Sequence, residues 1–293
     1  MNQILIKEKI NFFQKNGYVI FHQVVPHNLI DRFEKDFNEL LVANKPLKIS
    51  FADRIVPLNT IESSEEKEKY LKYGRFIDLD RFSLLSKQLI FYPIISQFLT
   101  DLYQGSKPTN LQTLTYKYSS QQGEHSDKYL VKPEWAGDYN KDSLTASWIA
   151  LEDASEDNGS LIIYPGSHLI PHKKRLIEDF NDNYREYVEY CRKICQKYQI
   201  EPEYFYAKKG DILLWHGDFI HAGGEIKDWT KTRFSIVCHY ANIENINSPI
   251  NRVIYQNLGY FYSELPNPTI SLKERLKRLI KLVIGYKYWK HKI

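Results

Sequence analysis

The stretch Gly123-Glu124-His125-Ser126-Asp127 is the feature from which the rest of the chain can be interpreted. It follows a β-rich run at residues 111–118 and a polar turn. A His and an Asp two residues apart at the end of an extended segment can both reach one point, and they offer two of the three ligands of a facial triad for non-haem Fe(II). An ordinary polar loop can give the same pattern. The motif therefore indicates a metal site only if a second histidine farther along the chain can supply the third ligand.

Residues 210–224, Gly-Asp-Ile-Leu-Leu-Trp-His-Gly-Asp-Phe-Ile-His-Ala-Gly-Gly, supply that histidine. The Gly-Asp turn opens a buried strand, a polar turn follows Trp215, and His221 begins the next strand. Twelve residues later, Arg233 and Ser235 begin another strand. Residues two apart on a strand face the same way, so a guanidinium would lie beside a hydroxyl. Such a pair inside a barrel is suited to binding a carboxylate.

The composition is that of an ordinary globular protein, with 26% charged and 43% apolar residues in a chain of 293. The 22 tyrosines and 15 phenylalanines favour β structure or an aromatic-lined cavity. Residues 271–293 hold eight Lys or Arg and one acid, whereas the whole chain has a net charge of only +4. The body is therefore slightly acidic, which argues against nucleic-acid binding.

Three cysteines, Cys191, Cys195 and Cys238, show no framework spacing, which argues against an oxidising compartment. Cys191 and Cys195 are four apart in a helical pattern, and we expect them to pack in an apolar interior. The chain shows neither a signal-peptide core nor an apolar run of about 18–20 residues. We therefore expect a cytoplasmic protein, with membrane association through its tail as an open alternative.

The order of elements divides residues 1–270 into a helical preface and a β-rich core within one domain. In the preface, residues 1–104, helical spacing at 4–16 and 26–41 flanks a strand at 18–21, and further helix is predicted at 63–72 and 84–103. In the core, about residues 105–245, short strands at close spacing predict a sandwich or jelly roll with helices packed outside. Residues 167–201 form an insertion with a helix at 184–198.

The tail, residues 271–293, predicts a separate basic amphipathic helix. Its apolar residues fall on one helical face, with Lys and Arg around them and Tyr286, Tyr288 and Trp289 at the end. Such a helix can lie on an anionic membrane. Packing on its own domain or on a partner subunit is the alternative. No feature of the sequence indicates an oligomeric state.

In order and spacing, these motifs resemble the phytanoyl-CoA dioxygenase (PhyH) family of Fe(II)/2-oxoglutarate-dependent oxygenases, from about residue 17 to residue 240. The resemblance is carried by His125-x-Asp127, Trp148-Ile-Ala-Leu-Glu-Asp, Asn158-Gly159, Pro165-Gly166-Ser167-His168, and the run from Gly210-Asp211 through His221 to Arg233. It implies a mainly β fold with flanking helices, a double-stranded β-helix (jelly roll, cupin-like).

The resemblance also implies roles for individual residues. It matches His125, Asp127 and His221 to the iron ligands, Arg233 to the clamp for the C5 carboxylate of 2-oxoglutarate, and Trp148 to the wall of the cosubstrate site. Family members use Fe(II), 2-oxoglutarate and O2, and we expect ascorbate as reductant. Relatives that halogenate have a small residue at the Asp127 position, so this Asp favours hydroxylation or a related oxidation.

Further candidates lie beside these residues. Ser235 adjoins Arg233, and Gln112 or Thr113, on the strand leading to His125, could contact the C1 carboxylate of the cosubstrate or the substrate. The other histidines are expected to be structural or exposed: His168 in a supporting turn, His216 outside the metal shell, and His239 pointing outward. We expect Lys117 and Lys128 to be solvated.

Three functions are compatible with these features. The first is an Fe(II)- and 2-oxoglutarate-dependent dioxygenase (EC 1.14.11.-) that oxidises a small metabolite, as in natural product biosynthesis, by hydroxylation or with demethylation or side-chain loss. The second is a hydroxylase of a lipid-linked or lipopolysaccharide sugar at the membrane surface. The third is a non-catalytic metal-binding jelly-roll protein. The loops at 128–142, with Tyr129, Trp135 and Tyr139, and at 167–201 should overhang the metal and contact a small-molecule substrate.

Overall fold

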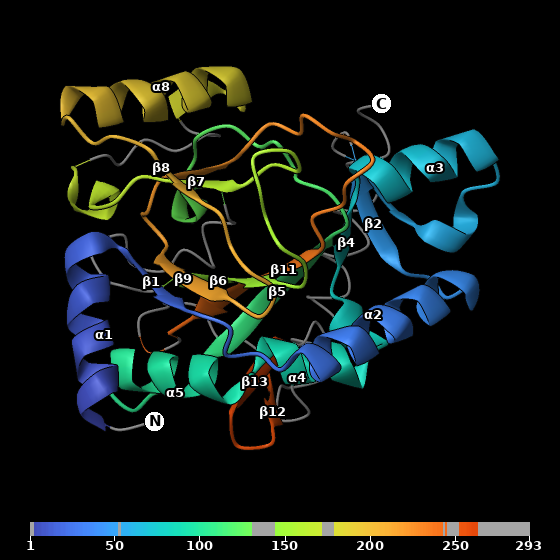
Figure 1. The fold of residues 1–293 in the computed structure, drawn as a ribbon, viewed down its shortest axis with the longest axis horizontal. Coiled ribbons are helices and arrows are strands. Elements are labelled where there is room, and N and C mark those ends of the chain that lie inside the picture. Colours follow the sequence, from blue (N-terminus) through green and yellow to red (C-terminus); the bar gives the residue numbers. More distant parts are fainter. Residues whose placement is uncertain are drawn as a thin grey trace, which may run out of the picture.

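A computed structural model describes residues 3–51, 54–130, 144–171, 179–242, 244 and 252–262. Two β-sheets lie one above the other, with helices outside them (Figure 1). The larger sheet has ten strands, of which eight run in the order β1 (Tyr18–Phe21), β9 (Ile212–His216), β6 (Leu144–Ala150), β11 (Ser235–Ala241), β5 (Thr109–Tyr116), β4 (Arg75–Ile77), β2 (Lys48–Phe51) and β3 (Arg54–Pro57). The mainly β jelly roll with flanking helices, expected from the sequence, is confirmed.

The remaining strands complete the two sheets. β12 (Arg252–Tyr255) pairs with β13 (Gly259–Tyr262), which runs parallel to β5. The small sheet has the order β10 (His221–Gly223), β7 (Leu161–Ile163) and β8 (Glu203–Phe205). The space between the two sheets is where the site lies, because β10 brings His221 to face the large sheet.

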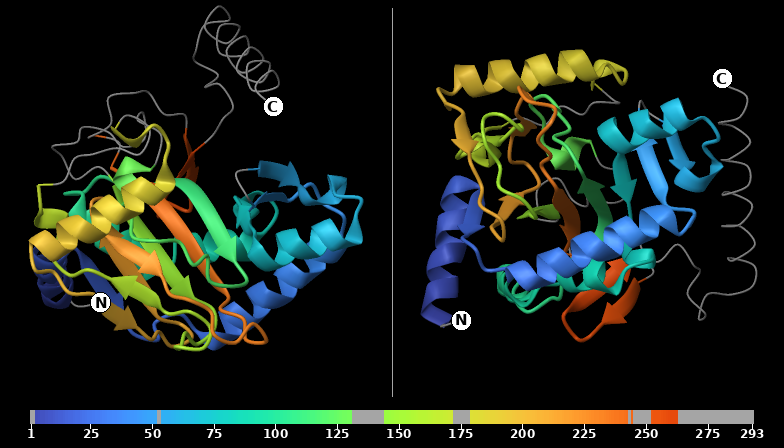
Figure 2. Two further views of the ribbon diagram at one scale, coloured as in Figure 1. Left: turned by 90° about the horizontal axis from the view of Figure 1, so that it is seen from above. Right: turned by 45° about the vertical axis from the view of Figure 1, so that its right-hand side comes forward.

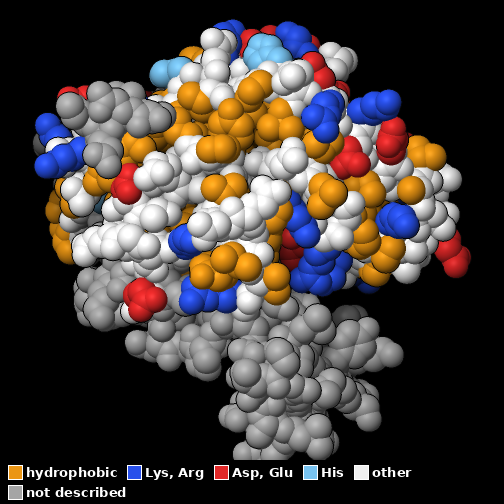
Figure 3. Space-filling model, turned by 90° about the horizontal axis from the view of Figure 1, so that it is seen from below, with side chains coloured by type: hydrophobic (Ala, Val, Ile, Leu, Met, Phe, Trp, Pro, Cys, Tyr) orange, Lys and Arg blue, Asp and Glu red, His pale blue; other side chains and the backbone are white. Residues whose placement is uncertain are grey.

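The helices surround the two sheets (Figures 1 and 2). They are α1 (Gln3–Asn16), α2 (His27–Val42), α3 (Ser64–Tyr73), α4 (Leu84–Ile90), α5 (Pro93–Leu102) and α8 (Tyr184–Lys197). The helices α2, α4 and α5 lie below the sheet, and α8 lies above the small sheet. The outer surface of the lower layer carries apolar side chains among Lys and Arg (Figure 3).

The predicted helices of the preface are confirmed, with Pro93 at the start of α5. Strands β2, β3 and β4 were not predicted, and they extend the large sheet beyond β5. The preface is therefore not only helical. Its strand β1 also pairs with β9, so the first hundred residues and the core share one continuous sheet.

Alternation along the strands decides which side chains face the site. On β6, every residue is buried, because Ile149 packs among the helices while Trp148 faces the other way, toward the small sheet. Just before β11, Phe234 stacks on Phe33 of α2, with ring centroids 5.8 Å apart. Arg233, the residue before Phe234, consequently faces the space between the sheets.

Above the small sheet, α8 buries Tyr187, Cys191 and Cys195 against Tyr164 and Ile220. The expected apolar packing of the two cysteines is confirmed, and both thiols are free. Among the helices that the structure describes, none has the length and apolarity that crossing a membrane requires. The predicted tail helix at 271–293, the boundary after residue 270, and Trp135 and Tyr139 lie outside the described residues.

Candidate metal centre and its cavity

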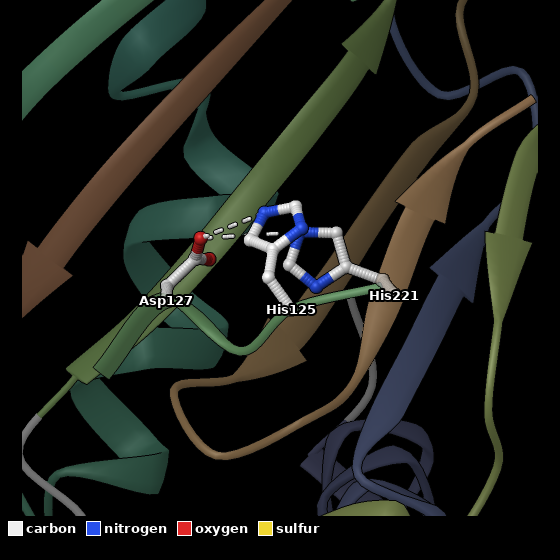
Figure 4. A group of neighbouring side chains, drawn as sticks. All are labelled: His125, Asp127 and His221. Atoms are coloured by element: carbon white, nitrogen blue, oxygen red, sulfur yellow. Dashed lines mark ion pairs between the residues drawn. The ribbon is translucent and has the colours of Figure 1, made fainter. Parts of the chain in front are cut away.

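His125, Asp127 and His221 converge between the two sheets (Figure 4). All three side chains are buried, and their ligand atoms lie within 4.8 Å of one another. Nε2 of His125 is 3.7 Å from Oδ1 of Asp127, and Nε2 of His221 is 3.9 Å from the same oxygen. The structure thus brings together the three residues that the sequence singled out, from two segments almost a hundred positions apart.

The backbone holds the two histidines against each other. The N–H of His125 donates to the carbonyl of His221, and the N–H of His221 donates back to the carbonyl of His125, both at 3.0 Å. In the rings, Nδ1 of His125 lies 2.7 Å from the carbonyl oxygen of Gly123, and Nδ1 of His221 lies 3.2 Å from that of Phe219. A carbonyl accepts only from a protonated nitrogen, so each Nε2 keeps a free lone pair, as a metal ligand requires.

Burial sets the charge of the three groups. Burial and the neighbouring His221 lower the pKa of His125 to about 3, although Asp127 opposes the shift. Burial likewise lowers the pKa of His221. For Asp127, burial alone would raise the pKa, but the surrounding histidines, His239 first among them, outweigh it and hold this pKa well below its usual range. At neutral pH the cluster therefore consists of two neutral imidazoles and one carboxylate.

The second carboxylate oxygen of Asp127 has two partners that the sequence analysis missed. Oδ2 accepts a hydrogen bond of 2.7 Å from Nε1 of Trp215 and lies 3.4 Å from Nε2 of His239. The expectation that His239 points outward is wrong, since the residue is only 6% exposed. Arg233, just before β11, and Ser235 and His239 on β11 are all an even number of positions apart. Residues with this spacing face the same side of a strand, so the spacing itself predicts that His239 faces the space between the sheets.

A cavity of about 440 Å³ adjoins the metal cluster. Its wall includes three further residues predicted to bind the cosubstrate or substrate: Gln112, Trp148 and Arg233. It also includes a set of mostly apolar residues on β4, β5 and β11, namely Ile77, Leu111, Leu114, Tyr116 and Val237. The cavity therefore extends from the metal cluster along the inner face of the large sheet.

Strand pairing orders the cavity wall into rows. His239 stands opposite Gln112 on one side and Ala146 on the other, and Ala146 stands opposite Trp215. This row marks the metal end. Two residues along, Val237 stands opposite Trp148, and a further two residues along comes Ser235. Arg233 thus lies at the far end of the cavity from Asp127.

Two buried donors of the cavity wall, Nε of Arg233 and Nε1 of Trp148, have no hydrogen-bond partner among the described residues. Oγ of Ser235, two residues from Arg233, is buried without a partner as well, although Ser235 itself is not part of the cavity wall. The Arg233 guanidinium lies 5.5 Å from the centroid of the Trp148 ring, and its Nη1 donates to the carbonyl of Gly159 at 2.9 Å. Burial lowers the pKa of Arg233 only to about 10, so it remains a cation. Because buried donors are normally satisfied, this group fits a ligand that brings acceptor oxygens.

The other predicted residues lie away from the cluster. Thr113 is on the opposite face of β5 from Gln112, and its hydroxyl bonds to Asn110. His168 contacts the carbonyl of Gln14 through Nε2, and His216 lies against His168, outside the metal cluster. These two positions agree with the structural roles expected for them.

The two lysines that were expected in solvent, Lys117 and Lys128, differ in their exposure. Lys117 is exposed, as expected. The expectation that Lys128 is solvated is wrong, because its side chain is 2% exposed and its ammonium lies 3.2 Å from Oδ2 of Asp218. Asp218 belongs to the turn before His221, so this ion pair joins the two segments that carry the metal ligands.

The insertion at 167–201 supports the ligand loop from above. From α8, the Tyr184 hydroxyl donates to the carbonyl of Gly123 at 3.3 Å, and Nη2 of Arg192 donates to Oε2 of Glu124 at 2.8 Å. The Tyr187 hydroxyl lies 3.3 Å from Oγ of Ser126. The helix thereby contacts three positions that flank His125, namely 123, 124 and 126, which adds a supporting role to the overhanging one predicted for this insertion.

A jelly roll that encloses two histidines and a carboxylate beside a deep cavity defines the class of non-haem metal-dependent oxygenases. Comparison with known families gives the same result. The model of the phytanoyl-CoA dioxygenase (PhyH) family matches residues 13–228, and the chain belongs to this family of 2-oxoglutarate-dependent non-haem iron dioxygenases.

Individual relatives and solved structures have low sequence identity to this chain. Peroxisomal phytanoyl-CoA dioxygenase of Homo sapiens is 23% identical over 252 residues, which cover 83% of this chain and 70% of that protein. The structure of the epimerase SnoN in complex with Fe3+, alpha ketoglutarate and nogalamycin RO matches with a TM-score of 0.57 at 16% identity, covering 82% of this chain and 84% of that one. EctD from S. alaskensis with bound Fe also has a TM-score of 0.57 at 16% identity, with 83% and 79% covered. These structural matches establish the fold.

Proposed function

We propose that this protein is an Fe(II)- and 2-oxoglutarate-dependent dioxygenase in which His125, Asp127 and His221 hold the iron. The observation that carries the proposal is the buried cluster of two neutral imidazoles and one carboxylate at one end of a cavity whose other end holds a buried cation. Two histidines and one carboxylate are the ligand set of the facial triad, which leaves three adjacent metal positions open.

The far end of the cavity fits the cosubstrate. A carboxylate would satisfy the donors of Arg233, Trp148 and Ser235 that lack partners. The Arg233 fork is suited to both oxygens of such a group, and the indole face of Trp148 lies against the guanidinium. We propose that Gln112, which stands opposite His239 and lines the cavity, donates to the C1 carboxylate or to the substrate. When bound together, iron, 2-oxoglutarate and O2 supply the oxidant, with succinate and CO2 as co-products.

The size of the cavity favours a small substrate. About 440 Å³ lies toward the lower end of the 300–1,000 Å³ typical of ligand pockets, and the cosubstrate would occupy part of it. We propose a small biosynthetic metabolite, oxidised by hydroxylation, with demethylation or side-chain loss as further outcomes. The likeness to SnoN, whose structure holds nogalamycin RO, supports natural product biosynthesis as the setting. We propose a cytoplasmic location.

Succinate formation tests this function directly. Protein purified without metal is given Fe(II) anaerobically, then 2-oxoglutarate, ascorbate and air, and succinate is measured. We expect slow, iron-dependent succinate release without substrate and faster release with the correct metabolite. A protein that binds iron but forms no succinate with any metabolite pool would instead be a non-catalytic metal-binding jelly roll. Zn(II) in place of Fe(II) is the matched control.

The lowered histidine pKa values predict how metal binding depends on pH. Two histidines of ordinary pKa, about 6.5, would cost a site roughly tenfold in affinity between pH 7 and pH 6, because protons compete with the metal. Here the pKa of His125 is about 3, so this ring stays unprotonated over the range, and the pKa of His221 is lowered by burial, so protons compete less for it than for an ordinary histidine. We expect Co(II) affinity, measured by titration, to change less than about threefold between pH 7 and pH 6. A tenfold loss would contradict the tautomer and charge assignment.

A further inference from the structure

The two oxygens of the Asp127 carboxylate have different surroundings. Oδ1 faces Nε2 of His125 and Nε2 of His221, at 3.7 and 3.9 Å. Oδ2 is turned away from the metal position and accepts from the Trp215 indole at 2.7 Å, with Nε2 of His239 at 3.4 Å. The Trp215 hydrogen bond and the nearby His239 nitrogen engage Oδ2, which leaves Oδ1 as the available ligand atom.

The sheet explains why both donors reach the same oxygen. Trp215 on β9 and His239 on β11 both stand directly opposite Ala146 of the intervening strand β6. Neighbouring strands lie about 4.8 Å apart, so the two side chains rise roughly 10 Å apart on either side of Ala146. The Ala146 methyl group leaves room above β6, and the Asp127 carboxylate occupies the space between the indole and the imidazole.

Trp215 also contacts a second metal-ligand candidate. Its ring centroid is 4.7 Å from that of His221, with the two ring planes at 50°. The indole is 2% exposed, and β1 closes the other side of its strand by pairing Tyr18 with Trp215. One rigid side chain therefore touches two of the three groups that would hold the metal.

We propose that Trp215 and His239 are positioning residues that fix Asp127 as a one-oxygen metal ligand through Oδ1. This inference rests on the proposed function. The inference concerns the number of metal positions that stay open. A carboxylate bound through both oxygens would occupy one of the three positions that 2-oxoglutarate and O2 need. Contacts that hold Oδ2 away from the metal would leave that coordination position open, and they would orient Oδ1 toward the metal site already in the metal-free protein.

Metal affinity of the apoprotein distinguishes this role from simple core packing. Trp215→Phe keeps an aromatic ring against His221 but removes the N–H donor together with part of the buried indole, and His239→Phe removes the imidazole nitrogen beside Oδ2 from a different strand. Loss of such second-layer hydrogen bonds typically weakens metal binding about 10- to 100-fold. We expect a loss of this size in Co(II) affinity for each variant, measured by titration in the visible range without 2-oxoglutarate. His239→Gln, which restores a donor, should recover most of it.

The matched control is Trp229→Phe. Trp229 packs on Tyr73 and Tyr118, outside the cavity wall, so this variant should bind Co(II) like the wild type. If Trp215→Phe and His239→Phe are both folded by circular dichroism and bind Co(II) as tightly as wild type, the positioning role is wrong while the proposed function stands. If the wild-type protein binds no Co(II) at all, the proposed function itself fails.

Discussion

Asp127→Ala is expected to reduce iron-dependent succinate formation to the background of protein without iron. The substitution removes the one charged ligand of the cluster and leaves the Trp215 and His239 donors without their acceptor. Loss of a direct ligand should exceed the roughly 10- to 100-fold effect of losing a hydrogen bond to one, so we expect at least a 100-fold decrease. Succinate is measured with saturating 2-oxoglutarate and with Fe(II) varied over several decades.

Asp101→Ala is the matched control, because Asp101 lies exposed on α5, where its carboxylate accepts a hydrogen bond from the Gln97 amide of the same helix. It should leave succinate formation unchanged. Asp127→Ala protein that is folded and still forms succinate at more than a tenth of the wild-type rate would show that this carboxylate is not an iron ligand.

Arg233→Met is expected to raise the 2-oxoglutarate concentration required for half-maximal succinate formation by roughly 10- to 100-fold. A charge-assisted hydrogen bond contributes about 1.5–3 kcal/mol, and the buried Arg233 guanidinium belongs to the cavity wall. Arg233→Lys keeps the charge but loses the planar fork, so its requirement should fall between those of wild type and Arg233→Met. Initial rates of succinate release against 2-oxoglutarate concentration give these values.

Arg185→Met serves as the control for loss of a cation, since Arg185 is exposed on α8. Iron affinity in the absence of 2-oxoglutarate should be unchanged in both Arg233 variants. An unaltered 2-oxoglutarate requirement in folded Arg233→Met protein would mean that the cosubstrate binds elsewhere in the cavity.

The metal cluster could be predicted because its residues lie in short motifs with characteristic spacing. His125 and Asp127 share one loop, and His221 follows a Gly-Asp strand that is itself recognisable. The partners of Asp127 could not be predicted in the same way. Trp215 reaches it from β9 across the sheet, and that contact depends on strand order, which no local pattern encodes.

Three differences from the sequence-based expectations have specific physical causes. His239 faces inward because it lies an even number of positions from Ser235 on β11, so the two side chains share one face of the strand. Lys128 was expected in solvent because lysines usually are, and its partner Asp218 lies ninety positions away. The strands β2 to β4 were missed because each has only three or four residues and no regular alternation of buried and exposed positions.

The pairing of β1 with β9 joins Tyr18 to Trp215, and the surroundings of the metal cluster combine the loop at Asp127 with side chains as late as His239. A ribosome that adds about 5–20 residues per second needs several more seconds after residue 127 before residue 239 exists. During that interval β5 and β6 are synthesised without β11, the strand that lies between them. The edges of β5 and β6 that pair with β11 in the folded sheet therefore stay without that partner on the nascent chain until β11 has been made.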